Sequence, residues 1–164
     1  MKQLTLIRHA KSSWENPQLS DFERPLNPRG QRDLPAMAER VRAKELIPDL
    51  LLYSSALRTT LTAQELSSCL LLPASHCKDV PEMYEACWET LLNLLQGQSD
   101  SHSRLMLVGH NPGIAELGAY LSGTPLPHFP TSCVQHLILN VLSWSELAES
   151  CGTSQWFDYP KLHR

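Results

Sequence analysis

Two arginines and two histidines stand at the ends of apolar segments of this chain or shortly beyond them. These residues are Arg8, His9, Arg58 and His110. A guanidinium group offers planar N–H donors to phosphate oxygens, and a neutral imidazole can attack phosphorus and carry the transferred group. A cation beside a nucleophile therefore suggests chemistry on an anion, most simply on a phosphoryl group.

The elements that must position these side chains are three apolar segments with the character of buried strands. They cover residues 4–7, 50–53 and 105–108. In open α/β proteins the ligand crevice lies outside the carboxyl ends of the strands. If the three strands are parallel, all four side chains emerge at one edge of the sheet and can converge there.

Helices are expected between these strands, because apolar residues recur there at helical spacing. The expected helices cover residues 29–45, 56–70, 88–95 and 114–121, and further strands are expected within 71–84, 134–142 and 156–160. Ser54 and Ser55 are expected to cap the second helix and Asn111 the fourth. Pro35 is expected to mark where the regular part of the first helix begins. Strands that alternate with helices predict an α/β fold with a mostly parallel sheet covered on both faces.

Length and charge narrow the class of protein. The chain of 164 residues has the length of one domain, so we expect a single domain over residues 1–164. A net charge of -3 without a basic block argues against a nucleic-acid partner. No apolar run reaches the length of a signal peptide or of a membrane span, so we expect a cytoplasmic protein with no membrane partner.

The cysteines and histidines give no sign of a metal site or a disulfide framework. The five cysteines are scattered and odd in number, which favours reduced thiols. No cysteine is followed by an arginine six positions later, so the simplest cysteine-phosphatase arrangement is absent. The seven histidines form neither an HxH pair nor an HExxH motif, and we expect no metal and no other cofactor.

Phosphoryl chemistry gives each of the converging residues a role. His9 can attack phosphorus in line, which splits the transfer into two steps through a phosphohistidine. Arg8 and Arg58 can neutralise the equatorial oxygens in the transition state, and His110 can donate to the same group if it is protonated. The helix that begins after Asn111 adds backbone N–H donors and the positive end of its dipole.

A general acid for the leaving group is the least certain part of the pattern. Glu85 is the first candidate, with Glu82 and Asp21 behind it, although Glu85 can equally be a solvated charge at a helix start. Arg24 either lines the pocket or forms a salt bridge within its loop. Ser12 either contacts the phosphate or shapes the turn. A phosphohistidine or acyl-phosphate substrate needs less acid catalysis, because its leaving group is already good.

Three segments together resemble the histidine phosphatase superfamily, and they cover residues 6–12, 54–59 and 108–113. The short length, the segment 21–26 and the tail 156–162 are similar to the SixA-type phosphohistidine phosphatases. The resemblance implies a three-layer α/β/α sandwich of the phosphoglycerate-mutase-like kind, no metal and a phosphohistidine intermediate. It also implies that His9 is the nucleophile and that Arg8, Arg58 and His110 are phosphate ligands.

Two departures from the superfamily pattern bear on the substrate. Ala10 stands where the superfamily usually has glycine, and the long insertion that covers the pocket of phosphoglycerate mutases is missing. A site without that cover suits a protein substrate. The interpretation is therefore a metal-independent phosphatase that acts on phosphohistidine of a protein. The alternatives are a phosphatase for small phosphomonoesters and a non-catalytic module that binds a phosphorylated protein, although binding alone needs no nucleophile.

Overall fold

The computed structural model describes all residues 1–164, and its six strands form one sheet. The strands are β1 (Lys2–Arg8), β2 (Leu50–Ser54), β3 (Cys77–Val80), β4 (Arg104–Gly109), β5 (Val134–Leu139) and β6 (Gly152–Asp158). Their order is β3-β2-β4-β1-β5-β6, and the first four are mutually parallel. Only β5 runs against its neighbours β1 and β6, so the predicted mostly parallel sheet is confirmed.

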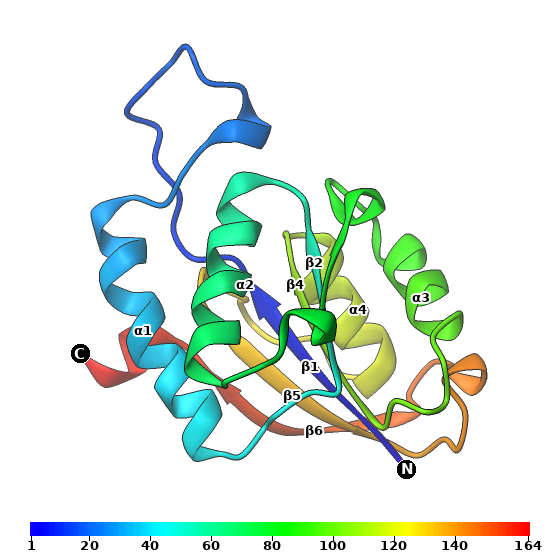
Figure 1. Cartoon of the computed structure of the whole chain (residues 1–164). Helices are drawn as coiled ribbons and strands as arrows, with labels where there is room; N and C mark the ends of the chain where they lie inside the picture. The colour runs from blue at the N-terminus through cyan, green and yellow to red at the C-terminus, as the bar shows by residue number, and fades with distance from the viewer.

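Four helices cover the two faces of the sheet, which confirms the three-layer α/β/α architecture. They are α1 (Pro28–Ala43), α2 (Leu57–Cys69), α3 (Trp88–Gln96) and α4 (Gly113–Ser122). Figure 1 shows α1 and α2 on one side of the sheet and α3 and α4 on the other. None of the helices combines the length and the apolar composition that a bilayer crossing requires.

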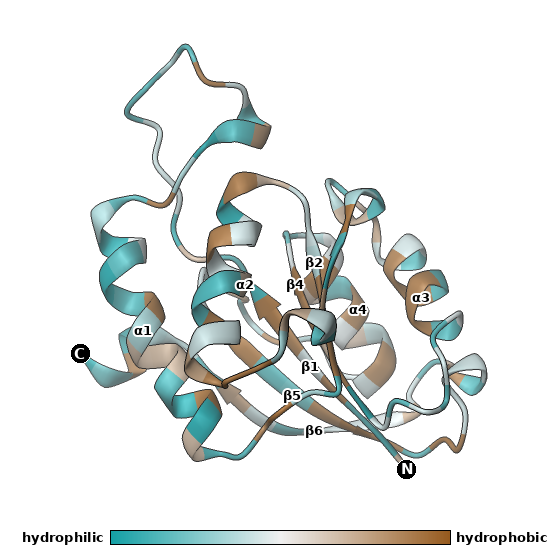
Figure 2. Ribbon diagram, in the orientation of Figure 1, coloured by the Kyte–Doolittle hydropathy of each residue, from teal (hydrophilic) through white to brown (hydrophobic).

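The core has two layers because side chains alternate between the faces of each strand. Leu4 and Leu6 of β1 are buried in the cluster that includes Leu117 of α4. Ile7 of β1 is buried in the cluster that includes Met37 of α1. The hydropathy colouring agrees, since the central strands are mostly apolar while the helices carry polar residues on their outer sides (Figure 2).

The first helix begins earlier than Pro35 and continues through it. The side chain of Asn27 caps α1 by accepting a hydrogen bond from the Gly30 N–H at 2.8 Å, and Pro28 takes the first helical position. Pro35 therefore lies inside α1, where it removes one backbone donor without ending the helix. A Cβ at Gly30 would lie 2.2 Å from the carbonyl oxygen of Lys11, so glycine lets α1 approach the loop that follows β1.

The expected helix caps are wrong at two helix starts. Ser54 is the last residue of β2, and α2 begins after Ala56 without a side-chain cap. Asn111 does not cap α4, because Pro112 occupies the N-cap position. In both cases the polar side chain forms a tertiary hydrogen bond instead. The Ser54 hydroxyl lies 2.8 Å from Nε2 of His110, and the Asn111 amide donates to the Phe129 carbonyl at 2.8 Å.

The last two strands differ from their expected ranges. β5 ends at Leu139, three residues earlier than expected, and β6 already begins at Gly152 and ends at Asp158. The two strands pair in antiparallel fashion over their length, which pulls residues before 156 into the sheet. His136 of β5 is buried, and its Nδ1 atom lies 2.9 Å from the hydroxyl of Thr5 on β1.

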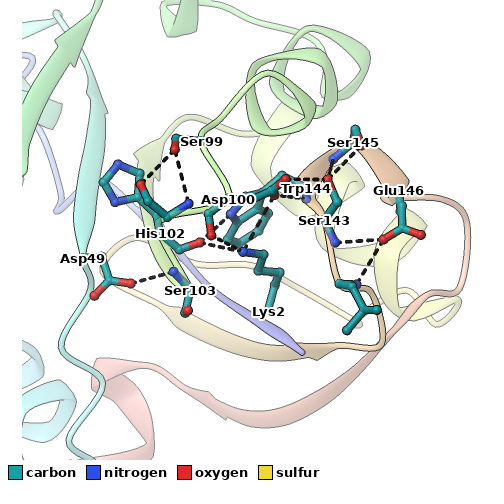
Figure 3. Close-up of polar contacts among 12 residues, drawn as sticks. Lys2, Asp49, Ser99, Asp100, His102, Ser103, Ser143, Trp144, Ser145 and Glu146 are labelled. Atoms are coloured by element: carbon teal, nitrogen blue, oxygen red, sulfur yellow. Dashed lines mark hydrogen bonds and ion pairs between the residues drawn. The ribbon is translucent and has the colours of Figure 1, made fainter.

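A polar network lies at the end of the sheet where β1 begins (Figure 3). The buried Lys2 ammonium donates to the carbonyl oxygens of Asp100 at 2.9 Å and His102 at 3.0 Å. The indole N–H of Trp144 donates to the same His102 carbonyl at 2.8 Å. Every donor in this set has a partner, as buried polar groups require, so its role is to hold loops together. The candidate functional site lies at the opposite end of the strands, where β1 ends at Arg8.

Candidate active site

A cavity of about 240 Å³ lies where β1, β2 and β4 end. It is lined by Arg8, His9, Lys11, Ser12, Trp14, Arg24, Arg58, His110, Asn111 and Thr131. Arg8 ends β1, His110 directly follows β4, and Arg58 is the second residue of α2 after β2. The cavity thus brings together every predicted site residue except the three candidates for the general acid, because none of Glu85, Glu82 and Asp21 lines it.

Hydrogen bonds from neighbouring elements fix the backbone on which His9 is carried. The His9 N–H donates to the carbonyl of Gly109 on β4 at 3.1 Å. The next amide, that of Ala10, donates to the hydroxyl of Thr62 on α2 at 2.9 Å. These bonds hold the loop after β1 to both β4 and α2, and they fix the position of the His9 imidazole in the cavity.

The tautomer of His9 follows from its hydrogen bond. Its Nδ1 atom lies 2.7 Å from the carbonyl oxygen of Ala10, and since a carbonyl only accepts, Nδ1 carries the proton. Burial, with smaller contributions from the nearby His110, Arg58 and Arg8, lowers the pKa of His9 to about 3, although the hydrogen bond to the Ala10 carbonyl acts in the opposite direction. His9 is therefore neutral near pH 7, and the lone pair of its Nε2 is available for attack.

His110 is also neutral in the unliganded site. Burial and the charge of Arg58 lower its pKa to about 4, although Asp21 acts in the opposite direction. The Nε2 atom of His110 lies 2.8 Å from the hydroxyl of Ser54, and Nδ1 is buried without a partner. The ring centroids of His9 and His110 are 5.3 Å apart. The condition under which the sequence predicts a donor role for His110, a protonated ring, is therefore not met near pH 7, but the neutral ring still holds one N–H.

Two of the three arginines that line the cavity are fixed by backbone carbonyls. Arg58 donates through Nη1 to the carbonyl of Asp21 at 2.7 Å, and Arg8 donates through Nη1 to the carbonyl of Phe129 at 3.1 Å. The Nε atoms of Arg8 and Arg58 are buried and have no hydrogen-bond partner. Since buried donors are normally paired, these groups are suited to an acceptor that enters the cavity.

Asp21 links two arginines of the cavity to the side chain of Tyr84. One carboxylate oxygen accepts from Arg58 at 3.0 Å and from the Tyr84 hydroxyl at 2.6 Å, and the other accepts from Arg24 at 3.0 Å. The bond from Tyr84 and those from the two arginines hold the pKa of Asp21 far below its usual range. Burial and the bond to Asp21 raise the pKa of Tyr84 to about 12. Asp21 is thus ionised, and Tyr84, which the sequence did not single out, is neutral.

Arg24 both lines the cavity and forms a salt bridge in its loop, so the two interpretations of this residue hold together. It is buried, donates to the hydroxyl of Ser12 at 2.6 Å and pairs with Asp21 at 3.0 Å. The Trp14 ring lies 3.6 Å from the guanidinium carbon while 76% of the Trp14 residue stays exposed. These residues belong to the loop that rises above the sheet between β1 and α1 (Figure 1).

Glu85 lies apart from the cavity. Its side chain is exposed, lines no part of the cavity and makes no hydrogen bond. Asn111 does line the cavity, and its amide donates to the Phe129 carbonyl at 2.8 Å, the same oxygen that holds Arg8. Thr131 was not anticipated, because it lies in the proline-containing loop before β5 and belongs to no motif.

The depressed pKa values of the two cavity histidines predict a loss of stability in acid. Unfolded histidine titrates near 6.5, so between that pH and about 3 the unfolded chain binds more protons than the folded protein. The free energy of unfolding therefore falls as pH decreases, by about 2 kcal/mol at pH 5 for one such group. Urea denaturation at pH 7 and pH 5 measures this. His110→Asn is expected to show a smaller drop than the unsubstituted protein, and equal drops would contradict the assignment.

The sequence matches the model of the histidine phosphatase superfamily (branch 1) over residues 4–96. An uncharacterized chloroplastic protein of Arabidopsis thaliana is 29% identical over 163 residues, which cover 94% of this chain and 74% of that protein. An uncharacterized protein of Mycobacterium tuberculosis strain H37Rv is 28% identical over 166 residues, which cover 94% of this chain and 100% of that protein. The match to the family model includes Arg8, His9 and Arg58, and the alignments to the two relatives cover nearly the whole chain.

Two solved structures share the fold over the whole chain. SixA from Agrobacterium tumefaciens is 29% identical with a TM-score of 0.84, and the alignment covers 97% of this chain and 98% of that chain. A protein histidine phosphatase SixA in complex with tungstate is 25% identical with a TM-score of 0.83, and the alignment covers 99% of each chain. The architecture and the sequence pattern of the cavity thus point to the same group of proteins.

Proposed function

The chain belongs to the histidine phosphatase superfamily and is a phosphatase of the SixA type, and we propose that it hydrolyses phosphohistidine on a protein. In this proposal His9 takes up the phosphoryl group as an enzyme phosphohistidine and water then releases it. The positive charge comes from arginines, and no metal takes part. The observation that carries the proposal is the neutral His9, whose Nδ1–H is fixed to a carbonyl in a cavity that also holds Arg8 and Arg58.

The first step exchanges one P–N bond for another. The Nε2 lone pair of His9 forms a bond to phosphorus while the bond from phosphorus to the substrate imidazole breaks, and that imidazole recovers a proton from water. Arg8 and Arg58 donate to the equatorial oxygens, where negative charge is spread in the transition state. The Ala10 carbonyl stabilises the positive charge that develops on the ring of His9.

The second step regenerates the enzyme. A water molecule attacks the phosphorus, the bond to His9 Nε2 breaks, and inorganic phosphate leaves with the oxygen and one proton of that water. The other proton neutralises the hydroxide that the first step left in the solvent. His9 returns to its neutral Nδ1–H form, which its low pKa favours. His110, with a buried and unpartnered Nδ1, supplies a further donor to the phosphoryl group.

The carboxyl groups near the cavity favour a substrate with a good leaving group. Asp21 is held ionised by Tyr84 and two arginines, so it has no proton to give near neutral pH. Glu85 stands outside the cavity. Alkyl phosphate esters need a general acid for an alkoxide leaving group, whereas an imidazole leaving group takes its proton from water near neutral pH. This contrast supports phosphohistidine over small phosphomonoesters as the substrate.

The rim of the cavity also supports a protein substrate. The Trp14 side chain is exposed and stacked on Arg24, and Tyr84 packs edge-to-face on Phe22 of the same loop, with ring centroids 4.9 Å apart. Exposed aromatic side chains held in place are typical anchors at protein interfaces. The tungstate complex of a SixA relative further indicates that this scaffold accepts a tetrahedral oxyanion.

The role of Glu85 as general acid stays a prediction, and Glu85→Gln tests it. Because Glu85 lies outside the cavity, we expect this substitution to leave hydrolysis of an alkyl phosphate and of a phosphohistidine peptide unchanged. A general acid would instead slow the ester more, since only the ester needs a protein acid. The measurement is kcat/KM on both substrates, with Glu89→Gln on the exposed start of α3 as the matched control. Unchanged activity on both substrates would remove Glu85 from the mechanism.

A substrate comparison tests the proposed function itself. A phosphohistidine protein, a panel of sugar phosphates and an aryl phosphate are each incubated with the enzyme, with and without EDTA. We expect the highest kcat/KM on phosphohistidine and no effect of EDTA. A preference for sugar phosphates would favour the small-phosphomonoester alternative. Tight binding of the phosphoprotein without turnover would favour the binding module.

A further inference from the structure

A second cavity adjoins the active site, and its volume of about 470 Å³ is larger. It is lined by Arg8, Lys11, Arg29, Asp33, His128, Pro130, Thr131, Tyr159, Pro160 and Lys161. Three of these residues, Arg8, Lys11 and Thr131, also line the active-site cavity. The two cavities therefore share one wall, and a single substrate molecule can extend from the first into the second.

The second cavity is strongly positive in a protein whose net charge is -3. Four permanent cations line it, and Asp33 is the single carboxylate. That carboxylate lies 3.6 Å from the side-chain nitrogens of both Arg29 and Arg32, and it also accepts from Arg164. The charge of Asp33 is thus already matched by residues of its own helix and of the C-terminus.

Several donors of this cavity have no partner. The ammonium groups of Lys11 and Lys161 make neither a hydrogen bond nor an ion pair, and the Tyr159 hydroxyl makes no hydrogen bond. The Nε atom of Arg8 is buried and also lacks a hydrogen-bond partner, whereas that of Arg29 lies 3.6 Å from the Asp33 carboxylate. Unpaired cations and buried donors around one space form a site for an anion.

We propose that this cavity binds a second anionic group of the substrate, a carboxylate of an acidic side chain next to the phosphorylated histidine. The inference rests on the proposed function for its protein substrate. The phosphoryl group occupies the cavity of His9, and the acidic neighbour lies against Lys161, Arg29 and Tyr159. The shared Arg8 and Lys11 lie between the two anions and attract both.

The substitution Lys161→Glu separates the second cavity from the active site. Lys161 is exposed in the short turn after β6 and is not among the residues that line the active-site cavity. Lys78→Glu is the matched control. Lys78 is exposed on β3, which is the edge strand farthest from β6, and its replacement changes the net charge by the same amount.

The first arm compares two phosphohistidine peptides that differ only in flanking glutamates or glutamines. We expect kcat/KM for the acidic peptide to be higher by about tenfold, mainly through KM, as two or three partly exposed ion pairs would give. Lys161→Glu is expected to abolish this ratio, Lys78→Glu to retain it, and 1 M salt to reduce it. Equal kcat/KM for the two peptides would overturn the inference while leaving the proposed function intact.

The second arm does not depend on turnover. Alkylphosphonates of two to five carbons that end in a carboxylate are compared, as inhibitors or by calorimetry, with those that end in a carboxamide. We expect one length at which the carboxylate binds more tightly, with the gain lost in Lys161→Glu. If no phosphopeptide is hydrolysed yet this gain appears, the proposed function fails and the anion subsite stands. If the carboxylate never binds better, no anion subsite exists.

Discussion

Replacing His9 with alanine is expected to lower kcat by at least about 10⁴-fold, because in the proposed mechanism His9 is the group that takes up the phosphoryl group. The enzyme would also lose all covalent labelling by a radioactive phosphoryl donor. Affinity for vanadate is expected to fall much less, since Arg8, Arg58 and His110 still surround the cavity. Stopped assays with a phosphohistidine peptide, together with calorimetric titration of vanadate, measure the two effects separately.

The matched control for this prediction is His76→Ala. His76 is exposed and makes no side-chain contact with the cavity, so its loss is expected to leave kcat unchanged. Melting curves of both variants check that the fold is retained. If His9→Ala kept a tenth of the activity, the nucleophile would have to be another residue or water.

The substitution Arg58→Ala is expected to reduce kcat/KM by about 10³-fold, the typical cost of one preorganised charged donor in a phosphoryl-transfer site. The loss has two sources in this structure. Arg58 lines the cavity and has a buried Nε without a hydrogen-bond partner, and its two Nη atoms also hold Asp21 of the loop above the site. Vanadate affinity is expected to fall with activity, because the arginine binds both the ground state and the transition state.

A second substitution at this position separates charge from shape. Arg58→Lys keeps the positive charge but loses the planar fork, so we expect activity between that of the alanine variant and that of the unsubstituted enzyme. Arg42→Ala, on the exposed face of α1 and paired only with Glu39, is the control for the loss of an arginine. Full vanadate affinity in Arg58→Ala would place Arg58 outside the phosphate site.

Much of the site could be predicted because it depends on strand order and strand polarity. The buried segment before Arg8, the buried segment before His110 and the helix start at Arg58 are all visible in the hydrophobic pattern. Once the strands are parallel, their carboxyl ends meet by geometry, and no detail of a loop is needed. The three-layer architecture follows from the same alternation of strands and helices.

The rest could not be predicted because it depends on contacts between distant loops. Asp21 and Arg58 are 37 positions apart, and the sequence gives no sign that a loop carboxylate reaches the second helix. Tyr84 lies 63 positions from Asp21 and is a partner only once both loops have their folded shape. Ser54 was expected to cap a helix, but the end of β2 directs its hydroxyl to His110 instead. Local sequence preferences cannot anticipate such tertiary partners.

The proposal that His9 Nε2 receives the phosphoryl group can be tested by locating that group during turnover. The enzyme is mixed with a phosphohistidine peptide, quenched in base within milliseconds to preserve P–N bonds, digested and mapped by mass spectrometry. We expect one transient phosphoryl group on the peptide that contains His9, which disappears once the substrate is exhausted. A phosphoryl group on His110, or rapid turnover with no phosphorylated enzyme at any time, would contradict it.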